Sequence, residues 1–248
     1  PLYSSAASDV YKRQGMNYVT GNTHFHMEGP CAVSLGKFDG VHRGHQKLLR
    51  HVLSGKDQGL AAVIFTFEKN PTRMLSGLSG QNIVTNEERR RLLEDAGVDH
   101  LLECPFVPEI SLMEAKTFIK EILVEQLHAA FVAVGEDFRF GHQRRGDFRM
   151  LERMGKQYGF QVEVVEKEKS HNRDISSTYV REALHEGNIP LANELLGYRY
   201  FVSGEVLHGR QIGRTLGLPT TNLLPPPDKL LPPNGVYLTR TLLDEEEY

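Results

Sequence analysis

The chain has 248 residues, of which 40% are apolar and 25% are charged. This is the composition of a globular protein, and it excludes collagen-like, low-complexity and wholly disordered chains. The net charge of −3 excludes a strongly basic nucleic-acid-binding protein. Two cysteines, Cys31 and Cys104, are too few for a disulfide framework and fit a reducing cytoplasm. No apolar run reaches the roughly 18–20 residues that span a bilayer.

Both ends of the chain are unusual. The first 15 residues, PLYSSAASDVYKRQG, are polar and lack the apolar region of a signal peptide. We interpret 1–15 either as a non-native extension, with Met16 as the native start, or as a natural disordered tail. At the other end, VYLTRTLL (236–243) is typical of a strand that needs further strands beside it. We therefore expect the chain to be a fragment.

Strand and helix patterns alternate between the two ends. Apolar β-branched runs predict strands at 31–35, 61–67, 98–106, 129–135 and 160–166, and amphipathic patterns predict helices at 42–54, 85–97, 111–127, 147–158 and 177–187. Thr85 with Glu88, and Ser111 with Glu114, have the spacing of capping boxes, and Gly97 is placed to end a helix. The alternation predicts an α/β fold, a Rossmann-like, doubly wound parallel sheet with helices on both faces.

The pattern changes after residue 187. A short helix at 190–196 is followed by strand-like runs at 200–209 and 235–243, with a Gly- and Pro-rich loop between them. Strands without intervening helices predict the start of a small antiparallel β-barrel. We therefore expect one domain over 16–187 and a second, incomplete domain over 188–248.

The first predicted strand leads into SLGKFDGVHRGHQKLL (34–49), where a doubly wound sheet binds ligands. Gly36 and Gly40 allow tight turns, and His42 and His45 lie three residues apart, on one helical face. That face is at a helix N-terminus, which favours phosphate. A zinc pair or two surface histidines is the alternative, but zinc needs a third and usually a fourth ligand.

A second polar motif, DISSTYVREAL (174–184), begins a later helix. Ser176, Ser177 and Thr178 gather at the helix start, and Arg181 follows one turn on. Hydroxyls, free N–H groups and a guanidinium are the groups of a phosphate clamp. Alternatively, the serines and threonine form a plain helix cap and the arginine is solvated.

These motifs resemble those of a known family. The first resembles the GxFDGxHxGH signature of the nucleotidylyl-transferase superfamily, and the second its ISSTxVR element. GRTLGLPTTN (213–222) resembles the GRxLGxPTxN loop of riboflavin kinases. Over about 17–240 the chain looks like a bacterial bifunctional riboflavin kinase/FAD synthetase, with Lys37 where the family often has Asn.

The resemblance implies a nucleotidylyl-transferase-type sheet that transfers AMP from ATP to FMN, giving FAD and pyrophosphate with Mg²⁺. It implies catalytic roles for His42, His45 and Arg181. The residues it implies for ATP phosphates are Gly36, Lys37, Phe38, Asp39, Gly40, Ser176, Ser177 and Thr178. Flavin contacts fall on TFEKNPTRML (66–75) and GEDFRFGHQRRGD (135–147), at Phe67, Asn70, Asp137, Phe138 and Phe140. Taken alone, such aromatic residues are more often part of a core.

For the second domain the resemblance implies that Gly213, Thr220 and Asn222 hold ATP, with Thr220 and Asn222 on Mg²⁺. The family's catalytic glutamate comes later in its barrel than this chain reaches. We therefore expect riboflavin phosphorylation from the intact parent and not from this chain.

Two other functions stay open. The chain could be an adenylyl- or cytidylyltransferase for another phosphorylated acceptor, since the histidine motif is shared across the superfamily. It could also be a non-catalytic flavin- or nucleotide-binding regulator. In each case we expect a cytoplasmic protein with small-molecule ligands (ATP, FMN and riboflavin for the favoured function) and no nucleic-acid or membrane partner. The sequence leaves the oligomeric state undetermined.

Overall fold

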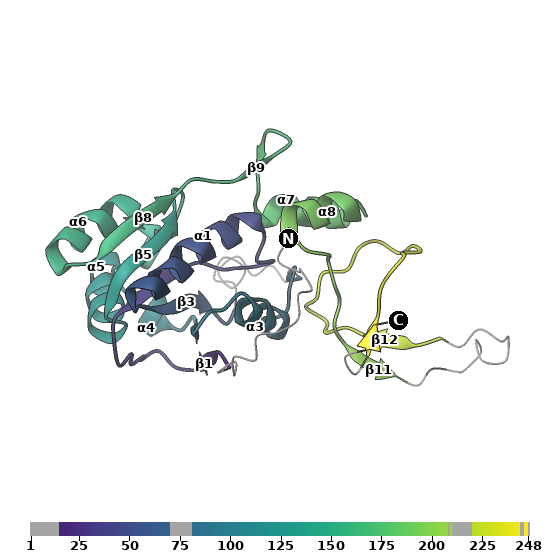
Figure 1. Ribbon diagram of the computed structural model, residues 1–248, viewed down its shortest axis with the longest axis horizontal. Coiled ribbons are helices and arrows are strands. Elements are labelled where there is room, and N and C mark those ends of the chain that lie inside the picture. Colours follow the sequence, from purple (N-terminus) through teal and green to yellow (C-terminus); the bar gives the residue numbers. More distant parts are fainter. Residues whose placement is uncertain (1–14, 70–80, 208, 210–219, 244–245, 248) are drawn as a thin grey trace.

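A computed structural model describes residues 15–69, 81–207, 209, 220–243 and 246–247. Its centre is a six-stranded parallel sheet in the order β1-β4-β3-β2-β5-β8. The strands are β1 Asn17–Thr20, β2 Cys31–Leu35, β3 Ala61–Phe67, β4 His100–Cys104, β5 Ala129–Gly135 and β8 Gln161–Val165. Figure 1 labels β1, β3, β5 and β8 of this sheet and shows the chain after α8 (Ile189–Leu196) to the right of it. The predicted tail at 1–15 lies, apart from residue 15, outside the described residues.

The sheet has one strand more than the five that the sequence predicts. Strand β1 pairs in parallel with β4, with Tyr18 opposite Leu101. It lies at the sheet edge, and its four residues, NYVT, are only partly buried. A short edge strand of this kind carries little hydrophobic periodicity, because neither of its faces is fully covered.

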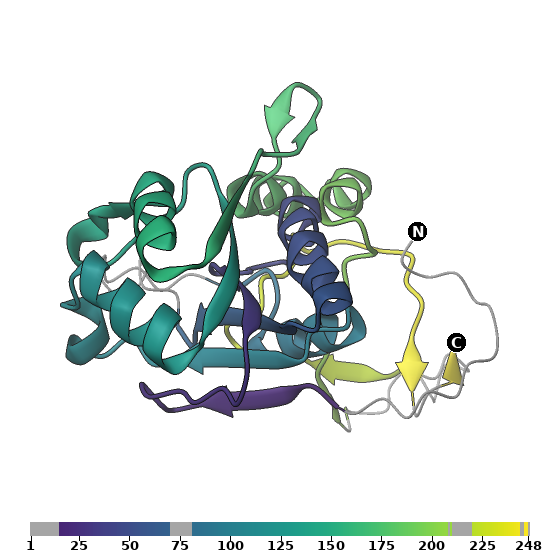
Figure 2. The same ribbon diagram turned by 60° about the vertical axis from the view of Figure 1, so that its left-hand side comes forward.

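Helices cover both faces of the sheet, as predicted (Figure 2). Strand β2 is buried along its whole length, and its alternate residues face opposite sides. Val33 belongs to a core with Ile119 of η2 (Phe118–Gln126) and Leu151 of α6 (Phe148–Tyr158). Ala32 belongs to a separate core with Val52 of α1 (Arg43–Ser54). The continuous apolar run of β2 is explained by this burial on both faces.

Most predicted helix boundaries agree with the structure to within two residues. Helix α3 (Asn86–Asp95) begins with the predicted capping box, in which the Thr85 hydroxyl accepts from the Glu88 amide and the Glu88 carboxylate accepts from the Thr85 amide. Further elements are η1 Gly55–Gln58, β6 Arg139–Phe140, η3 His142–Arg144, β7 Gly146–Asp147, β9 Lys169–Ser170, β10 Arg173–Asp174, α7 Ser177–His185 and α8 Ile189–Leu196.

The predicted helix at 111–127 is wrong at its start. Ser111 ends a separate short helix, α4 (Pro108–Ser111), and Glu114 precedes α5 (Ala115–Thr117), which continues into η2. Pro108 occupies the first turn of α4, where its missing N–H costs nothing, so a helix begins earlier than the capping pattern suggests. No hydrogen bond from Ser111 caps the later helix; its hydroxyl faces the Pro108 carbonyl.

The chain after α8 forms short antiparallel pairs, as predicted for the start of a barrel. Strand β11 (Glu205–Leu207) pairs with β12 (Asn222–Leu224), and β13 (Leu242–Leu243) pairs with β14 (Glu246–Glu247). The predicted strands at 200–209 and 235–243 are thus much shorter than expected. Val236 and Leu238 are fully exposed and have no ladder partner among the described residues, so their alternation does not by itself form a strand.

Within the described part of the chain, no helix has the length and apolar character needed to cross a membrane.

Candidate active site

The paired histidines of the first motif lie at the start of α1, directly after β2. His42 is the residue that precedes the helix, and His45 lies in its first turn. Their rings stack with centroids 3.7 Å apart and planes 21° from parallel. The three-residue spacing therefore brings the two imidazoles together on one face, as the sequence predicts.

The loop that carries them is strained. Phe38, Gly40 and Val41 have φ values of 48°, 85° and 39°. Positive φ is costly for a β-branched residue such as Val41 and persists only where the surroundings enforce it. Phe38 and Val41 are both buried in one hydrophobic core, and the Phe38 ring lies 5.0 Å from the His45 ring. The loop is therefore held in the shape that places the histidines.

Burial favours the neutral form of both histidines. Burial lowers the pKa of His42 to about 4, although nearby Asp39 partly opposes the shift. Burial and the neighbouring His42 hold the pKa of His45 well below its ordinary value. The Nδ1 atoms of both rings are buried and have no hydrogen-bond partner among the described residues. Buried nitrogens of this kind are suited to a ligand that supplies the missing partner.

The structure brings the second motif against the first. The Arg181 guanidinium forms an ion pair with the Asp39 carboxylate, and the Ser177 hydroxyl donates to the Asp39 carbonyl over 2.9 Å. Ser176 caps α7 by accepting from the Tyr179 amide. Of the three hydroxyls assigned to phosphate, the Ser176 and Ser177 side chains thus make protein contacts, and Thr178 is exposed.

An open cleft lies beside this junction. Its lining residues come from the ends of β2 and β3, from the segment before α3 and from α3 itself: Lys37, Asp39, Phe67, Glu68, Lys69, Asn82, Val84, Asn86 and Arg89. The predicted phosphate-binding residues Lys37 and Asp39 thus share a cleft with the predicted flavin-binding residue Phe67. Gly36 and Gly40 flank these residues in the same loop.

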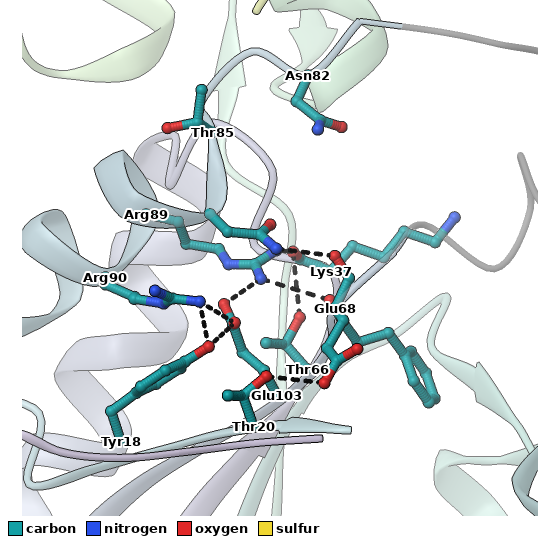
Figure 3. Close-up of polar contacts among 12 residues, drawn as sticks. Tyr18, Thr20, Lys37, Thr66, Glu68, Asn82, Thr85, Arg89, Arg90 and Glu103 are labelled. Atoms are coloured by element: carbon teal, nitrogen blue, oxygen red, sulfur yellow. Dashed lines mark hydrogen bonds and ion pairs between the residues drawn. The ribbon is translucent and has the colours of Figure 1, made fainter. Parts of the chain in front are cut away.

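A buried ionic cluster under the cleft was not predicted from the sequence (Figure 3). Arg89 pairs with the Glu103 carboxylate and also donates to the carbonyls of Lys37 (3.3 Å) and Phe67 (3.4 Å). Arg90 contacts the other Glu103 oxygen at 3.1 Å. The sequence does contain a sign of this cluster: Glu103 lies in the otherwise apolar strand HLLEC, and a glutamate buried in such a strand requires charged partners.

The predicted flavin residues of the later loop divide between core and surface. The Phe140 ring is buried against Phe118, and the Phe138 ring stacks on it at 5.5 Å. Asp137 is exposed and pairs with Lys167 at 3.0 Å. The predicted flavin residue Asn70 lies outside the described residues.

The predicted kinase residues are partly described. Thr220 and Asn222 are exposed just before and within β12, and Gly213 lies outside the described residues. The described residues hold no group of three or more His, Cys, Asp or Glu side chains that could bind a metal ion.

Comparison with known families and proteins gives two adjoining matches. The FAD synthetase family matches residues 25–179, and the riboflavin kinase family matches residues 196–248. A protein of Escherichia coli (strain K12) named bifunctional riboflavin kinase/FMN adenylyltransferase is 38% identical over 214 residues, which are 86% of this chain and 68% of the relative. The protein of that name from Haemophilus influenzae is 37% identical over 222 residues, covering 88% of this chain and 71% of the relative.

Among solved structures, one from Streptococcus pneumoniae has a similar fold. It is described as a macrolide-efflux protein, is 28% identical and superposes with a TM-score of 0.83, over 94% of this chain and 76% of that one. The sequence matches extend over both halves of the chain and include the histidine motif and the serine–arginine motif. The chain therefore belongs to the bifunctional riboflavin kinase/FMN adenylyltransferase family.

Proposed function

We propose that residues 16–187 of this chain transfer AMP from ATP to FMN, forming FAD and pyrophosphate. The observation that carries the proposal is the ion pair between Asp39 and Arg181, which joins the two phosphate-binding motifs beside the stacked histidines. Phosphate-binding groups from two distant segments converge at the carboxyl ends of the strands, where a doubly wound sheet binds its ligand.

In the reaction, an FMN phosphate oxygen attacks the α-phosphorus of ATP, and the bond from that phosphorus to the bridging oxygen of pyrophosphate breaks in line. A phosphate monoester is already an adequate nucleophile, so catalysis consists of positioning and charge stabilisation. His42 and His45 contact the ATP phosphates. An anion beside the rings raises their pKa, so they can meet growing negative charge as donors.

Arg181 and Thr178 hold the pyrophosphate side. The Asp39 carboxylate engages one Nη of Arg181 and so orients the guanidinium toward the nucleotide. Lys37 is exposed at the cleft and adds positive charge there. Mg²⁺ bound with ATP supplies charge neutralisation on the phosphates.

We place the flavin beside Phe67, Asn70, Asp137, Phe138 and Phe140. Phe67 lines the cleft, and the partly buried Phe138 ring offers an aromatic face for stacking. Phe140 supports Phe138 from below through their stacked rings. In this arrangement Asp137 gives up its ion pair with Lys167 and contacts the polar edge of the flavin ring instead.

We infer that residues 188–248 belong to the domain that phosphorylates riboflavin in the intact parent protein, and we do not expect this chain to carry out that reaction. The carrying observation is the riboflavin kinase match over 196–248. Thr220 and Asn222 fit Mg²⁺, because both offer exposed oxygen donors and Mg²⁺ takes one or two protein oxygens together with substrate phosphates. With Gly213 they would hold metal-bound ATP.

The adenylyl transfer is tested by incubating the purified chain with ATP, Mg²⁺ and FMN and detecting FAD by chromatography. Parallel reactions with CTP, and with pantetheine phosphate as acceptor, test the other transferases. Arg181→Lys should strongly reduce FAD formation, because a point charge does not replace a guanidinium that engages a carboxylate and a phosphate together. Arg173→Lys is the matched control, since Arg173 pairs with Glu182 at the surface.

A folded wild-type chain that forms no FAD would contradict the proposal. If Arg181→Lys and Arg173→Lys form FAD at equal rates, the proposed activity stands, but Arg181 has no role in it.

A further inference from the structure

Lys229 belongs to the second half of the chain, yet its side chain is buried against the first half. The ammonium group donates to the Ile83 carbonyl at 2.8 Å and to the Glu88 carboxylate at 2.6 Å. The Tyr200 ring centroid lies 4.5 Å from it. Burial lowers the pKa of this lysine, and Glu88 opposes the shift. A fully buried ammonium is expensive and is kept only where its partners are fixed.

The backbone around Lys229 is attached to the same segment. Asn82 donates its amide to the Asp228 carbonyl at 2.6 Å, and Leu230 donates its amide to the Asn82 carbonyl at 2.8 Å. Asn82 and Lys229 thereby form an isolated parallel bridge. The amide group of the Asn82 side chain adds a bond to the Asp228 carboxylate at 3.0 Å. Residues 82–83 are therefore held by residues 228–230.

The segment held in this way contacts the nucleotide site directly. The Ile83 amide donates to the Asp39 carboxylate at 2.9 Å, and that carboxylate pairs with Arg181. Arg181 also donates to the Gln81 carbonyl at 3.4 Å. The peptide groups of Ile83 thus link the two residues: its N–H donates to Asp39, and its carbonyl accepts from Lys229.

We propose that Lys229 is a positioning residue for the nucleotide site, acting through Ile83 on the Asp39–Arg181 pair. The inference rests on the proposed adenylyl transfer. Glu88 fixes the ammonium, and its carboxylate also accepts from the Ser203 amide at 3.0 Å, so two segments of the second half are attached at the start of α3. Residues matched to the riboflavin kinase family therefore shape the site of the other reaction.

The position of the Lys229–Ile83 contact determines whether its loss weakens the binding of ATP or of FMN. Loss of Lys229 frees the Ile83 carbonyl, and the Asp39–Arg181 pair then loses one of its fixed supports. Among the described residues, the ammonium of Lys229 contacts Ile83, Glu88 and the rings of Tyr200 and Phe201, and not the flavin residues Phe67 and Phe138. The effect therefore falls on ATP and spares FMN.

The test compares Lys229→Met with Lys56→Met. Lys56 is the matched control, because it also donates to a carbonyl (Gly97, 2.7 Å) and a carboxylate (Asp99, 2.8 Å), but outside the site. Steady-state FAD formation and ATP binding by calorimetry are measured below the melting temperature of every variant. Lys229→Met should lower kcat/KM for ATP on the order of tenfold or more and weaken ATP binding, with the KM for FMN unchanged. Lys56→Met should match wild type.

If Lys229→Met does not fold, Asp228→Ala takes its place, since it removes the exposed side-chain bond to Asn82 and a charge near Lys229 but leaves the buried lysine in the chain. Asp228→Ala should also lower kcat/KM for ATP and weaken ATP binding, by a smaller factor than Lys229→Met. Normal ATP binding and kcat/KM in a variant with only a lowered melting temperature would overturn the positioning role. A wild-type chain that makes no FAD would instead contradict the adenylyl transfer, and the ATP-binding comparison would still decide the role of Lys229.

Discussion

At the scale of single residues, the site combines buried neutral imidazoles with exposed charge. His42 and His45 stack on each other, and their Nδ1 atoms have no partner in the described part of the chain. Lys37, in the histidine motif, is exposed and carries the charge, and the Thr178 side chain of the second motif is exposed as well. A neutral ring at a helix start can donate to phosphate without first losing a salt bridge, so the site is ready for an anion.

His45→Ala should reduce kcat for FAD formation by a factor of about 10²–10³, because one donor to growing transition-state charge is lost. FMN binding should change little. Steady-state kinetics and FMN titration measure the two effects. His51→Ala, in the last turn of the same helix, is the control. A kcat close to wild type in His45→Ala would remove this residue from the catalytic site.

The histidines also predict an acid-sensitive fold. The folded pKa of His42 is about 4, below the value near 6.5 of an unfolded histidine. The unfolded chain therefore takes up a proton first, so this stabilisation is complete above about pH 6.5 and is lost as the pH falls towards 4. The shift corresponds to about 3 kcal/mol.

Urea unfolding of the ligand-free chain at several pH values between about 7 and 4.5 checks this expectation. His42→Gln should lose less stability than wild type over that range, and His26→Gln, at an exposed position, should lose as much as wild type. If the free energy of unfolding falls equally with pH in wild type and in His42→Gln, the proposed contribution of His42 is contradicted.

At the scale of elements, α3 fastens the carboxyl ends of three neighbouring strands. Arg89 reaches the Lys37 carbonyl after β2, the Phe67 carbonyl at the end of β3 and the Glu103 carboxylate in β4 (Figure 3). Arg90 supports Glu103 from the β1 side, with its guanidinium 3.8 Å from the Tyr18 ring centroid. The cleft floor is therefore an ionic cluster as well as a sheet edge.

Arg89→Met should destabilise the fold by about 3–5 kcal/mol, because it leaves Glu103 buried without its main partner. The double variant Arg89→Met/Glu103→Gln should be more stable than Arg89→Met alone, since the uncompensated charge is gone. Urea unfolding midpoints measure both. Arg91→Met, exposed on the same helix, should stay near wild type. A double variant less stable than the single one would contradict the charge explanation.

At the scale of the whole molecule, the second half is attached to the first by a few buried residues. Leu230 and Lys229 are buried, whereas the side chains of β11 and β12 are exposed. Leu230 packs in a core with Ile83 and Leu195. Among the described residues after 198, the buried ones are Lys229 and Leu230, so the larger domain protects little of that described part.

Hydrogen exchange should show this division. Amides of β11 and β12 should exchange much faster than those of β2 and β3, because they lie in a short exposed ladder. The Leu230 amide should be protected like the larger domain, since it donates to Asn82 beside the buried Lys229. Mass spectrometry with peptide resolution around 225–231 measures it. Exchange at Leu230 as fast as at Val206 would contradict the attachment described here.

Several features of the protein were determined by the sequence. The apolar runs at 31–35, 61–67 and 129–135 predicted β2, β3 and β5 with the observed bounds. The Thr85–Glu88 spacing predicted the capping box of α3. These signals work because periodicity and capping act between residues within about four positions of each other.

Tertiary structure decided the contacts between residues of different elements, which periodicity and capping signals do not determine. Glu88 caps its own helix, and it also holds Lys229, 141 residues further on. Glu103 and Arg89 pair only because β4 and α3 pack together, and β1 becomes a strand only beside β4. The Asp39–Arg181 contact has the same origin. Local sequence specifies the elements and the motifs, whereas contacts between separate elements depend on which strands the topology makes neighbours.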